Sequence, residues 1–174
     1  MSSTTTETKT WVLDPVHSSI GFEVDYAGGT FRGSFREASA RFDGQALAGS
    51  AKVASVDVKD ENLNAHLQSP DFFDAERYPE LRFESSEIEQ NGNAVTVRGV
   101  ITIRGEERPV ELTGTINDPI KDAYGNDRLG LRLETTVDRT QFGLNWNAPL
   151  PGGGDALAHE VKLTSELYFV PAEA

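Results

Sequence analysis

The sequence predicts an all-β fold, an eight-stranded antiparallel barrel with a short helical insertion. Apolar residues alternate with other residues over most of the chain, which is the period of a strand with one buried face. Several of these runs reach about ten residues, longer than usual for the strands of a sandwich and suited to a tall barrel. Helical spacing occurs in one short stretch, so helices cannot cover a second sheet face. The sheet is therefore expected to close on itself.

The first strand is expected over residues 20–26, and two long bent strands follow over residues 31–42 and 51–58. A change of parity between Val53 and Val56 predicts a β-bulge in the third strand. Hairpin turns are expected at Asn91-Gly92 and near Gly105, because these residues favour tight turns. The later strands carry the alternating apolar residues Leu81, Phe83, Val95, Val97, Ile101, Ile103, Val110, Leu112, Ile116, Leu129, Leu131, Leu133, Val137, Val161, Leu163, Leu167 and Phe169.

Residues 60–78 are the exception to this pattern. Leu63, Leu67 and Phe72 have roughly helical spacing, and prolines interrupt and end the run. We expect one or two short helices here. They are expected to cover one end of the barrel, with Leu67, Phe72 and Phe73 closing over its interior.

Length and composition exclude several functions. A chain of 174 residues is the size of one domain, predicted to have a disordered tail over residues 1–10 and a barrel over 11–170. The chain has no cysteine, which excludes thiolate catalysis, disulfides and iron–sulfur clusters. A net charge of −12 disfavours nucleic acid and anionic lipid as partners. No run approaches the ~20 apolar residues of a membrane span, and the polar N-terminus does not resemble a signal peptide, so a cytoplasmic protein is expected.

Four motifs carry a family resemblance. They are WVLDPVHS at residues 11–18, HLQSPDFF at 66–73, YPELRF at 78–83 and RTQFG at 139–143. Together and in this order they resemble the YceI family of polyisoprenoid-binding, lipocalin-like proteins, over residues 11–169. The resemblance implies a lipocalin-like barrel that encloses an elongated apolar molecule, such as a polyprenyl chain or a fatty amide. The family has no established catalytic residues to transfer.

The predicted site is therefore the barrel interior, with an apolar small molecule as partner and no cofactor or metal. Aromatic residues could equally fill a solid core, and the resemblance is what favours a lined cavity. Monomer and homodimer stay open. The expected ligand-binding residues are Ile20, Phe22, Val24, Phe35, Phe42, Leu67, Phe72, Phe73, Phe83, Ile101, Leu131, Leu133, Phe142, Trp146 and Leu163.

Histidine offers the alternative of an enzyme. His17 with Asp14, or His66 with Asp71, could form an acid–base pair for a hydrolase or isomerase of isoprenoid-like substrates. The three histidines are scattered, however, and none belongs to a His-Glu-x-x-His motif. A structural hydrogen bond is the better interpretation of His17. A solid-cored interaction module is the third alternative.

The remaining polar features are interpreted as structural. Gly152–Asp155 lacks the lysine and following helix of a phosphate loop and is expected to be a mobile loop. Residues 122–127 lack the spacing of a calcium loop and are expected to form a solvated turn. Arg32 and Arg36 have the opposite parity to their phenylalanine neighbours, so both arginines are expected to face water.

Overall fold

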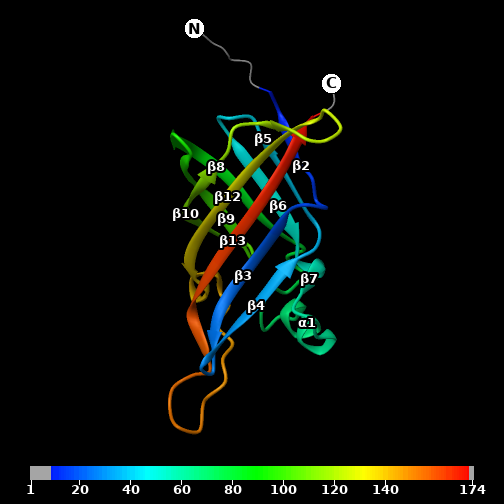
Figure 1. The fold of residues 1–174 in the computed structure, drawn as a ribbon. Helices are drawn as coiled ribbons and strands as arrows, with labels where there is room; N and C mark the ends of the chain where they lie inside the picture. Colours follow the sequence, from blue (N-terminus) through cyan, green and yellow to red (C-terminus); the bar gives the residue numbers. More distant parts are fainter. Residues whose placement is uncertain (1–8, 173–174) are drawn as a thin grey trace.

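A computed structural model describes residues 9–172, which form a closed eight-stranded antiparallel barrel with one short helix (Figure 1). The predicted fold class is confirmed. The strand segments are β2 (Trp11–Leu13), β3 (Ser19–Tyr26), β4 (Gly29–Phe35), β5 (Ala38–Phe42), β6 (Leu47–Lys52), β7 (Val56–Asp57), β8 (Glu80–Asn91), β9 (Ala94–Ile103), β10 (Glu106–Ile116), β11 (Ile120–Lys121), β12 (Asp127–Asp138) and β13 (Leu157–Pro171). The helix is α1 (Glu61–Gln68), and η1 (Val53–Ser55) and η2 (Arg139–Phe142) are short 3-10 helices.

The barrel closes through β13. This strand pairs with β12 along one edge, while its other edge pairs first with β3 and then with β2. The remaining wall runs from β12 through β10, β9, β8, β6 and β5 back to β2. Each strand of this ring therefore has two neighbours, which removes most of the exposed edges of an open sheet. Within the described strands, β7 pairs only with β4, so a gap remains between β7 and β8.

Three of the eight strand positions are split into two segments. β2 and β3 lie end to end along β13. β5 pairs with β2 and β4 pairs with β3. In the next position, β6 pairs with β5 and β7 pairs with β4. The bend expected between residues 31 and 42 falls at Arg36 and Glu37. The expected bulge after Val53 is wrong: the parity changes through the turn η1. The Ser55 hydroxyl accepts from the Glu37 N–H at 3.0 Å and donates to the Lys52 carbonyl at 2.6 Å, which fixes that turn.

The helical insertion contains one helix. The Asp60 side chain caps the N-terminus of α1 by accepting the Leu63 N–H at 2.9 Å, and the Ser69 hydroxyl donates to the His66 carbonyl at the other end. The segment lies beside β7, at the end of the barrel away from the chain termini (Figure 1). It stands where β7 has no pairing with β8, so it completes the side wall as well as flanking one end.

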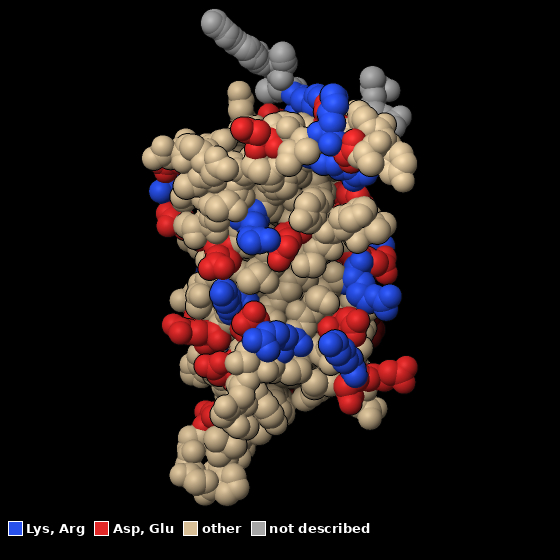
Figure 2. Space-filling view, viewed as in Figure 1, with Lys and Arg blue, Asp and Glu red and all other residues tan. Residues whose placement is uncertain are grey.

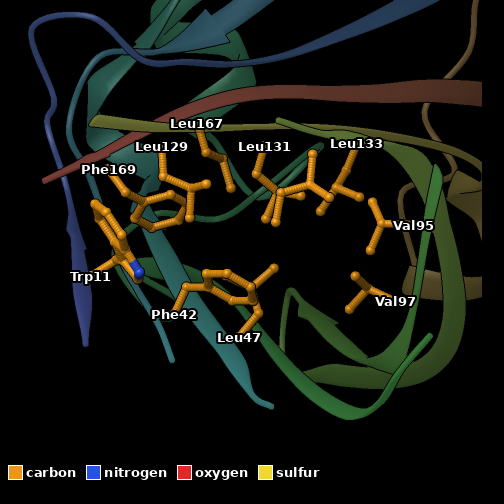
Figure 3. Packing of buried hydrophobic residues seen from close by; sticks show 11 residues of the cluster. Trp11, Phe42, Leu47, Val95, Val97, Leu129, Leu131, Leu133, Leu167 and Phe169 are labelled. Atoms are coloured by element: carbon orange, nitrogen blue, oxygen red, sulfur yellow. The ribbon is translucent and has the colours of Figure 1, made fainter. Parts of the chain in front are cut away.

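The interior near the chain termini is filled by side chains. We call this set of buried residues the plug, and Figure 3 shows its side chains converging from several strands. Phe169 and Val97 have no exposed surface there, and the rings of Phe42 and Phe169 lie 5.8 Å apart. The plug consists of Trp11, Phe42, Leu47, Val95, Val97, Ile116, Leu129, Leu131, Leu133, Leu167 and Phe169. We call this end of the barrel the plugged end.

The outer wall is polar. Acidic and basic side chains are interspersed over it (Figure 2). Arg32 lies on this surface and pairs with Glu23, and Arg36 is exposed, as their parity predicts. Arg98 joins three glutamates on neighbouring strands, Glu87, Glu89 and Glu111. No helix among residues 9–172 is long and apolar enough to cross a membrane.

Ion pairs hold the loops at the plugged end. Arg128 donates to the Asp14 carboxylate at 2.7 Å and to that of Asp122 at 3.0 Å, so it joins the loop before β3 to the loop after β11. Residues 122–127 form a turn, as expected, in which the Asp122 side chain also accepts the Tyr124 and Asn126 N–H groups. The predicted disordered tail, residues 1–10, lies outside the described residues except for its last two. Of these, Thr10 accepts the Ala172 N–H at 2.9 Å.

Acid is expected to weaken this end of the fold. Hydrogen bonds from Lys9 and Lys121 lower the pKa of Asp127 from 3.8 to about 2. A carboxylate with a lowered pKa stabilises the fold fully above its unfolded pKa and loses that contribution as pH falls through its folded pKa. The melting temperature should therefore fall between about pH 4 and pH 2, and an Asp127→Asn variant should show a shallower fall. Thermal melts across that range test this, with the exposed Asp25→Asn as control; equal slopes for all three proteins would contradict it.

Candidate functional site

A cavity of about 380 Å³ lies between the plug and the opposite end of the barrel. We call that opposite end the mouth; α1, the β3–β4 turn and the loop after η2 lie there (Figure 1). The walls are almost wholly apolar. Phe22 and Val24 on β3, Phe35 on β4 and Leu163 on β13 lie on their inner faces, because they hold the alternate positions of those strands.

Most of the residues predicted from the sequence line this cavity. They are Ile20, Phe22, Val24, Phe35, Leu67, Phe72, Phe73, Phe83, Ile101, Leu133, Phe142, Trp146 and Leu163. Phe42 and Leu131 do not, although both point inward. They belong to the plug, where neighbouring side chains cover them on every side, and they are only 5% and 2% exposed.

Glycines give the aromatic rings room to lie flat on the wall. Gly33 stands opposite Phe22 in the β3–β4 pairing, and a β-carbon at Gly33 would come within 2.4 Å of the Phe22 ring. Gly99 does the same for Phe83, with 2.8 Å to that ring. Such distances are below van der Waals contact, so a side chain at Gly33 would displace the Phe22 ring. At Gly99 a side chain would collide first with the Glu84 carbonyl oxygen of β8 and then with the Phe83 ring.

Three rings meet at the mouth. The His66 ring lies 5.0 Å from Phe72 and 5.1 Å from Trp146, edge-on to both, and the last two rings lie 5.4 Å apart. His66 and Phe72 come from the helical insertion, whereas Trp146 comes from the loop after η2. The cluster therefore joins the two segments that border the opening.

Arg104 also connects the helical insertion to the segment after η2, through hydrogen bonds to both. It lies in the tight β9–β10 turn, where Arg104 and Gly105 both have positive φ. Its guanidinium donates to the Pro70 carbonyl of the insertion at 2.9 Å and to the Gly143 carbonyl at 3.1 Å. The rim of the mouth is thus held by hydrogen bonds on one side and by packed rings on another.

Arg139 is a buried cation at the edge of the cavity, only 4% exposed. It donates to the carbonyls of Leu144 at 2.6 Å, Trp146 at 2.9 Å, Leu157 at 3.1 Å and Ala158 at 2.7 Å. No carboxylate of the described residues lies within ion-pair distance of it. Burial lowers the pKa of Arg139, yet arginine is basic enough to stay charged. The guanidinium therefore shapes the loop after η2 by binding its backbone.

That loop carries no charge over residues 140–154. It projects below the mouth, and its surface is almost entirely uncharged in Figure 2. A bridge between Pro149 and Asp155 closes its tip, and the Gly152–Asp155 stretch lies there, between η2 and β13. An apolar molecule that enters the cavity would thus pass a rim with few charges.

The two candidate acid–base pairs form, but in different places. The His17 Nδ1 and an Asp14 oxygen lie 2.7 Å apart at the plugged end, where His17 does not line the cavity and Arg128 binds the same carboxylate oxygen. The hydrogen bond with His17, together with those from the Val16 N–H and Arg128, lowers the pKa of Asp14. His66 lines the cavity at the mouth, with its Nε2 3.1 Å from an Asp71 oxygen.

Other titratable residues do not gather at the cavity. His159 is exposed on β13, far along the chain from the other histidines. Residues 9–172 contain no group of three or more histidines and carboxylates placed to hold a metal ion.

Two features of the site escaped sequence reasoning. Arg139 opens the RTQFG motif, but a charged residue gives no sign in the sequence that it will be buried. Leu144 and Leu157 also line the cavity, although they lie in or next to the loop after η2, outside the alternating patterns. The hydrophobic alternation therefore could not identify Arg139. The only sign of its importance was its position in the RTQFG motif, one of the four motifs that carry the family resemblance.

The fold and the site define a closed antiparallel barrel with an apolar cavity open at one end. A family model described as YceI-like domain matches residues 11–169, and the chain belongs to this family. The resemblance found in the four motifs is thus confirmed. A UPF0312 protein of Staphylococcus epidermidis is 30% identical to this chain, in an alignment that covers 90% of this chain and 95% of the length of that protein.

Two solved structures share the fold. BcnA of Burkholderia cenocepacia superimposes with a TM-score of 0.75 at 24% identity, covering 90% of this chain and 98% of that protein. A domain of Saccharophagus degradans described as polyisoprenoid-binding has a TM-score of 0.69 at 11% identity, covering 95% of this chain and all of that domain. At these identities the likeness concerns the fold.

Proposed function

We propose that this protein binds an elongated apolar molecule in the barrel cavity and stores or carries it without converting it. The observation that carries the proposal is the cavity itself, about 380 Å³ with almost wholly apolar walls and an uncharged loop, residues 140–154, beside its mouth. A polyisoprenoid or a fatty amide has the required chemistry. The relation to a domain described as polyisoprenoid-binding supports the same class of ligand.

Burial of hydrocarbon supplies enough free energy for such binding. Removing ~400 Å² of ligand surface from water at ~25 cal/mol per Å² gives roughly 10 kcal/mol before costs. Ordering the ligand takes back several kcal/mol, which still leaves room for micromolar or tighter affinity. No charged anchor is required.

The same geometry disfavours an enzyme. His17 and Asp14 lie at the plugged end, separated from the cavity by packed side chains, so they cannot reach a bound molecule. His66 can, but its ring is packed between Phe72 and Trp146, and its carboxylate partner Asp71 does not line the cavity. A general base and acid that converge on one substrate atom are therefore missing among the described residues.

The first test is what the purified protein holds. Organic extraction followed by mass spectrometry is expected to release an apolar lipid in near-equimolar amount. The delipidated protein should then bind farnesol with a saturable change in Trp146 emission, because this ring borders the cavity. A Trp11→Phe variant leaves Trp146 as the only tryptophan and isolates its signal. No extracted lipid and no response to any alkyl or prenyl alcohol would contradict the proposal.

The His17→Ala variant is the control for the enzyme alternative. It should bind farnesol as the parent does, even if its melting temperature falls, because affinity resides in hydrocarbon burial. Farnesol recovered after long incubation should be unchanged with either protein. Conversion by the parent, but not by His17→Ala, would instead make His17 catalytic.

A further inference from the structure

The cavity ends inside the barrel rather than passing through it. Leu47 on β6, Leu133 on β12 and Leu167 on β13 belong to the plug and also line the cavity, so they form its floor. All three are nearly fully buried, at 4%, 2% and 5% exposure respectively. Beyond them, Leu131 and Leu129 continue along the same face of β12 into packed side chains (Figure 3). A chain that enters at the mouth therefore meets a closed end.

The volume of the cavity above this floor limits the length of the ligand chain that it can enclose. A cavity of roughly 150 Å³ holds benzene, which amounts to about 25 Å³ per carbon. On that scale a cavity of about 380 Å³ encloses about 15 carbons, or about three isoprene units. Longer chains would have to leave their remaining carbons outside the mouth, because packed interiors resist the intrusion of extra groups.

We propose that this barrel is a length-limited site that encloses about 15 carbons of one alkyl or prenyl chain, with the floor residues Leu47, Leu133 and Leu167 setting the limit. The inference rests on the proposed function and adds to it the size of the ligand and its direction. The tail enters first, because a hydrated polar end would have to lose its water to pass the apolar walls. The polar end stays at the mouth, beside His66 and Trp146.

A chain-length series tests the limit in the Trp11→Phe background. The probes are decanol, dodecanol, tetradecanol, hexadecanol and octadecanol, each titrated below its solubility limit with Trp146 emission as the readout. Each methylene that enters the cavity should raise affinity about fourfold. The gain per carbon should stop near 15 carbons, because further methylenes remain in water.

Floor variants test which residues set the limit. Leu133→Ala and Leu47→Ala each open room for about three more carbons, so the break in affinity should move to about 18 carbons. Leu129→Ala is the matched control: the same truncation, on the same face of β12, opens a void that Leu131 and Leu133 separate from the cavity. In Leu129→Ala, affinity should therefore stop rising at the same chain length as in the parent. Two floor variants are used, so that the limit can still be tested if one of them does not fold.

The outcomes separate the two proposals. A break near 15 carbons that moves in a floor variant but not in Leu129→Ala supports the limit. If affinity in the Trp11→Phe parent still rises fourfold per carbon up to octadecanol, the limit is overturned while apolar binding stays intact. A parent break that no floor variant moves overturns it in the same way. Failure of every alcohol to change Trp146 emission overturns the proposed function, and the limit with it.

Discussion

An Arg139→Met variant should lose about 3 kcal/mol of unfolding free energy, because the carbonyls of Leu144, Trp146 and Ala158 lose the donor that satisfies them. The Leu157 carbonyl keeps a second donor, the Asn147 side chain at 2.7 Å. Removing the cation also removes the cost of burying a charge, which offsets part of the lost stability. The expected loss of unfolding free energy is therefore smaller than three unsatisfied carbonyls alone would cause. Urea unfolding provides the measurement.

Two matched variants define the result for Arg139. Arg139→Lys keeps the charge but cannot place donors on four carbonyls at once, so it should fall between the parent and Arg139→Met. Arg132→Met, on the outer face of β12, loses only an exposed pair with Glu166 and should change stability by less than about 0.5 kcal/mol. If Arg139→Met and Arg132→Met were equally stable, the guanidinium would not hold the loop.

Truncation of Phe169 should cost more than truncation of Phe83, although both are inward-facing phenylalanines. Phe169 has no exposed surface and packs against Phe42 inside the plug, so Phe169→Ala should lose about 4 kcal/mol. Phe83 lines the cavity, so fewer contacts are lost in Phe83→Ala, and about 2 kcal/mol or less is expected. Urea unfolding of the delipidated proteins compares them. Equal losses would show that the interior is packed alike at both ends and would contradict an open cavity.

The β pattern was predictable because period-two alternation and tight turns are local properties. Leu129, Leu131 and Leu133 alternate on β12 as expected, and the turn at Gly105 joins β9 to β10. The splitting of strands was not predictable, because it depends on distant partners. The turn at η1 exists where Ser55 reaches back to Glu37, a contact that no spacing rule encodes.

The candidate site was predictable by face but not by depth. Alternation places Leu131 and Leu133 on the same inner face, yet Leu133 borders the cavity while Leu131 lies within the plug. Depth depends on which side chains meet across the ring, and that requires the register of all the strands together. Arg139 shows the opposite case. Its charge suggests a surface position, and only the carbonyls around it explain its burial.

The closing of the barrel by β13 also bears on how the chain folds as it is made. Pro171 pairs with Trp11, so this contact of the ring joins the first and the last strand segments of the barrel. Contacts of such separation are slow to form, because a long loop must be ordered first. Until the ribosome has released residues 157–171, β12 and β3 keep open edges, and the apolar inner face stays in contact with water. The nascent barrel is thus most prone to aggregate just before residues 157–171 emerge, when nearly all of its apolar inner surface is present and β13 is not.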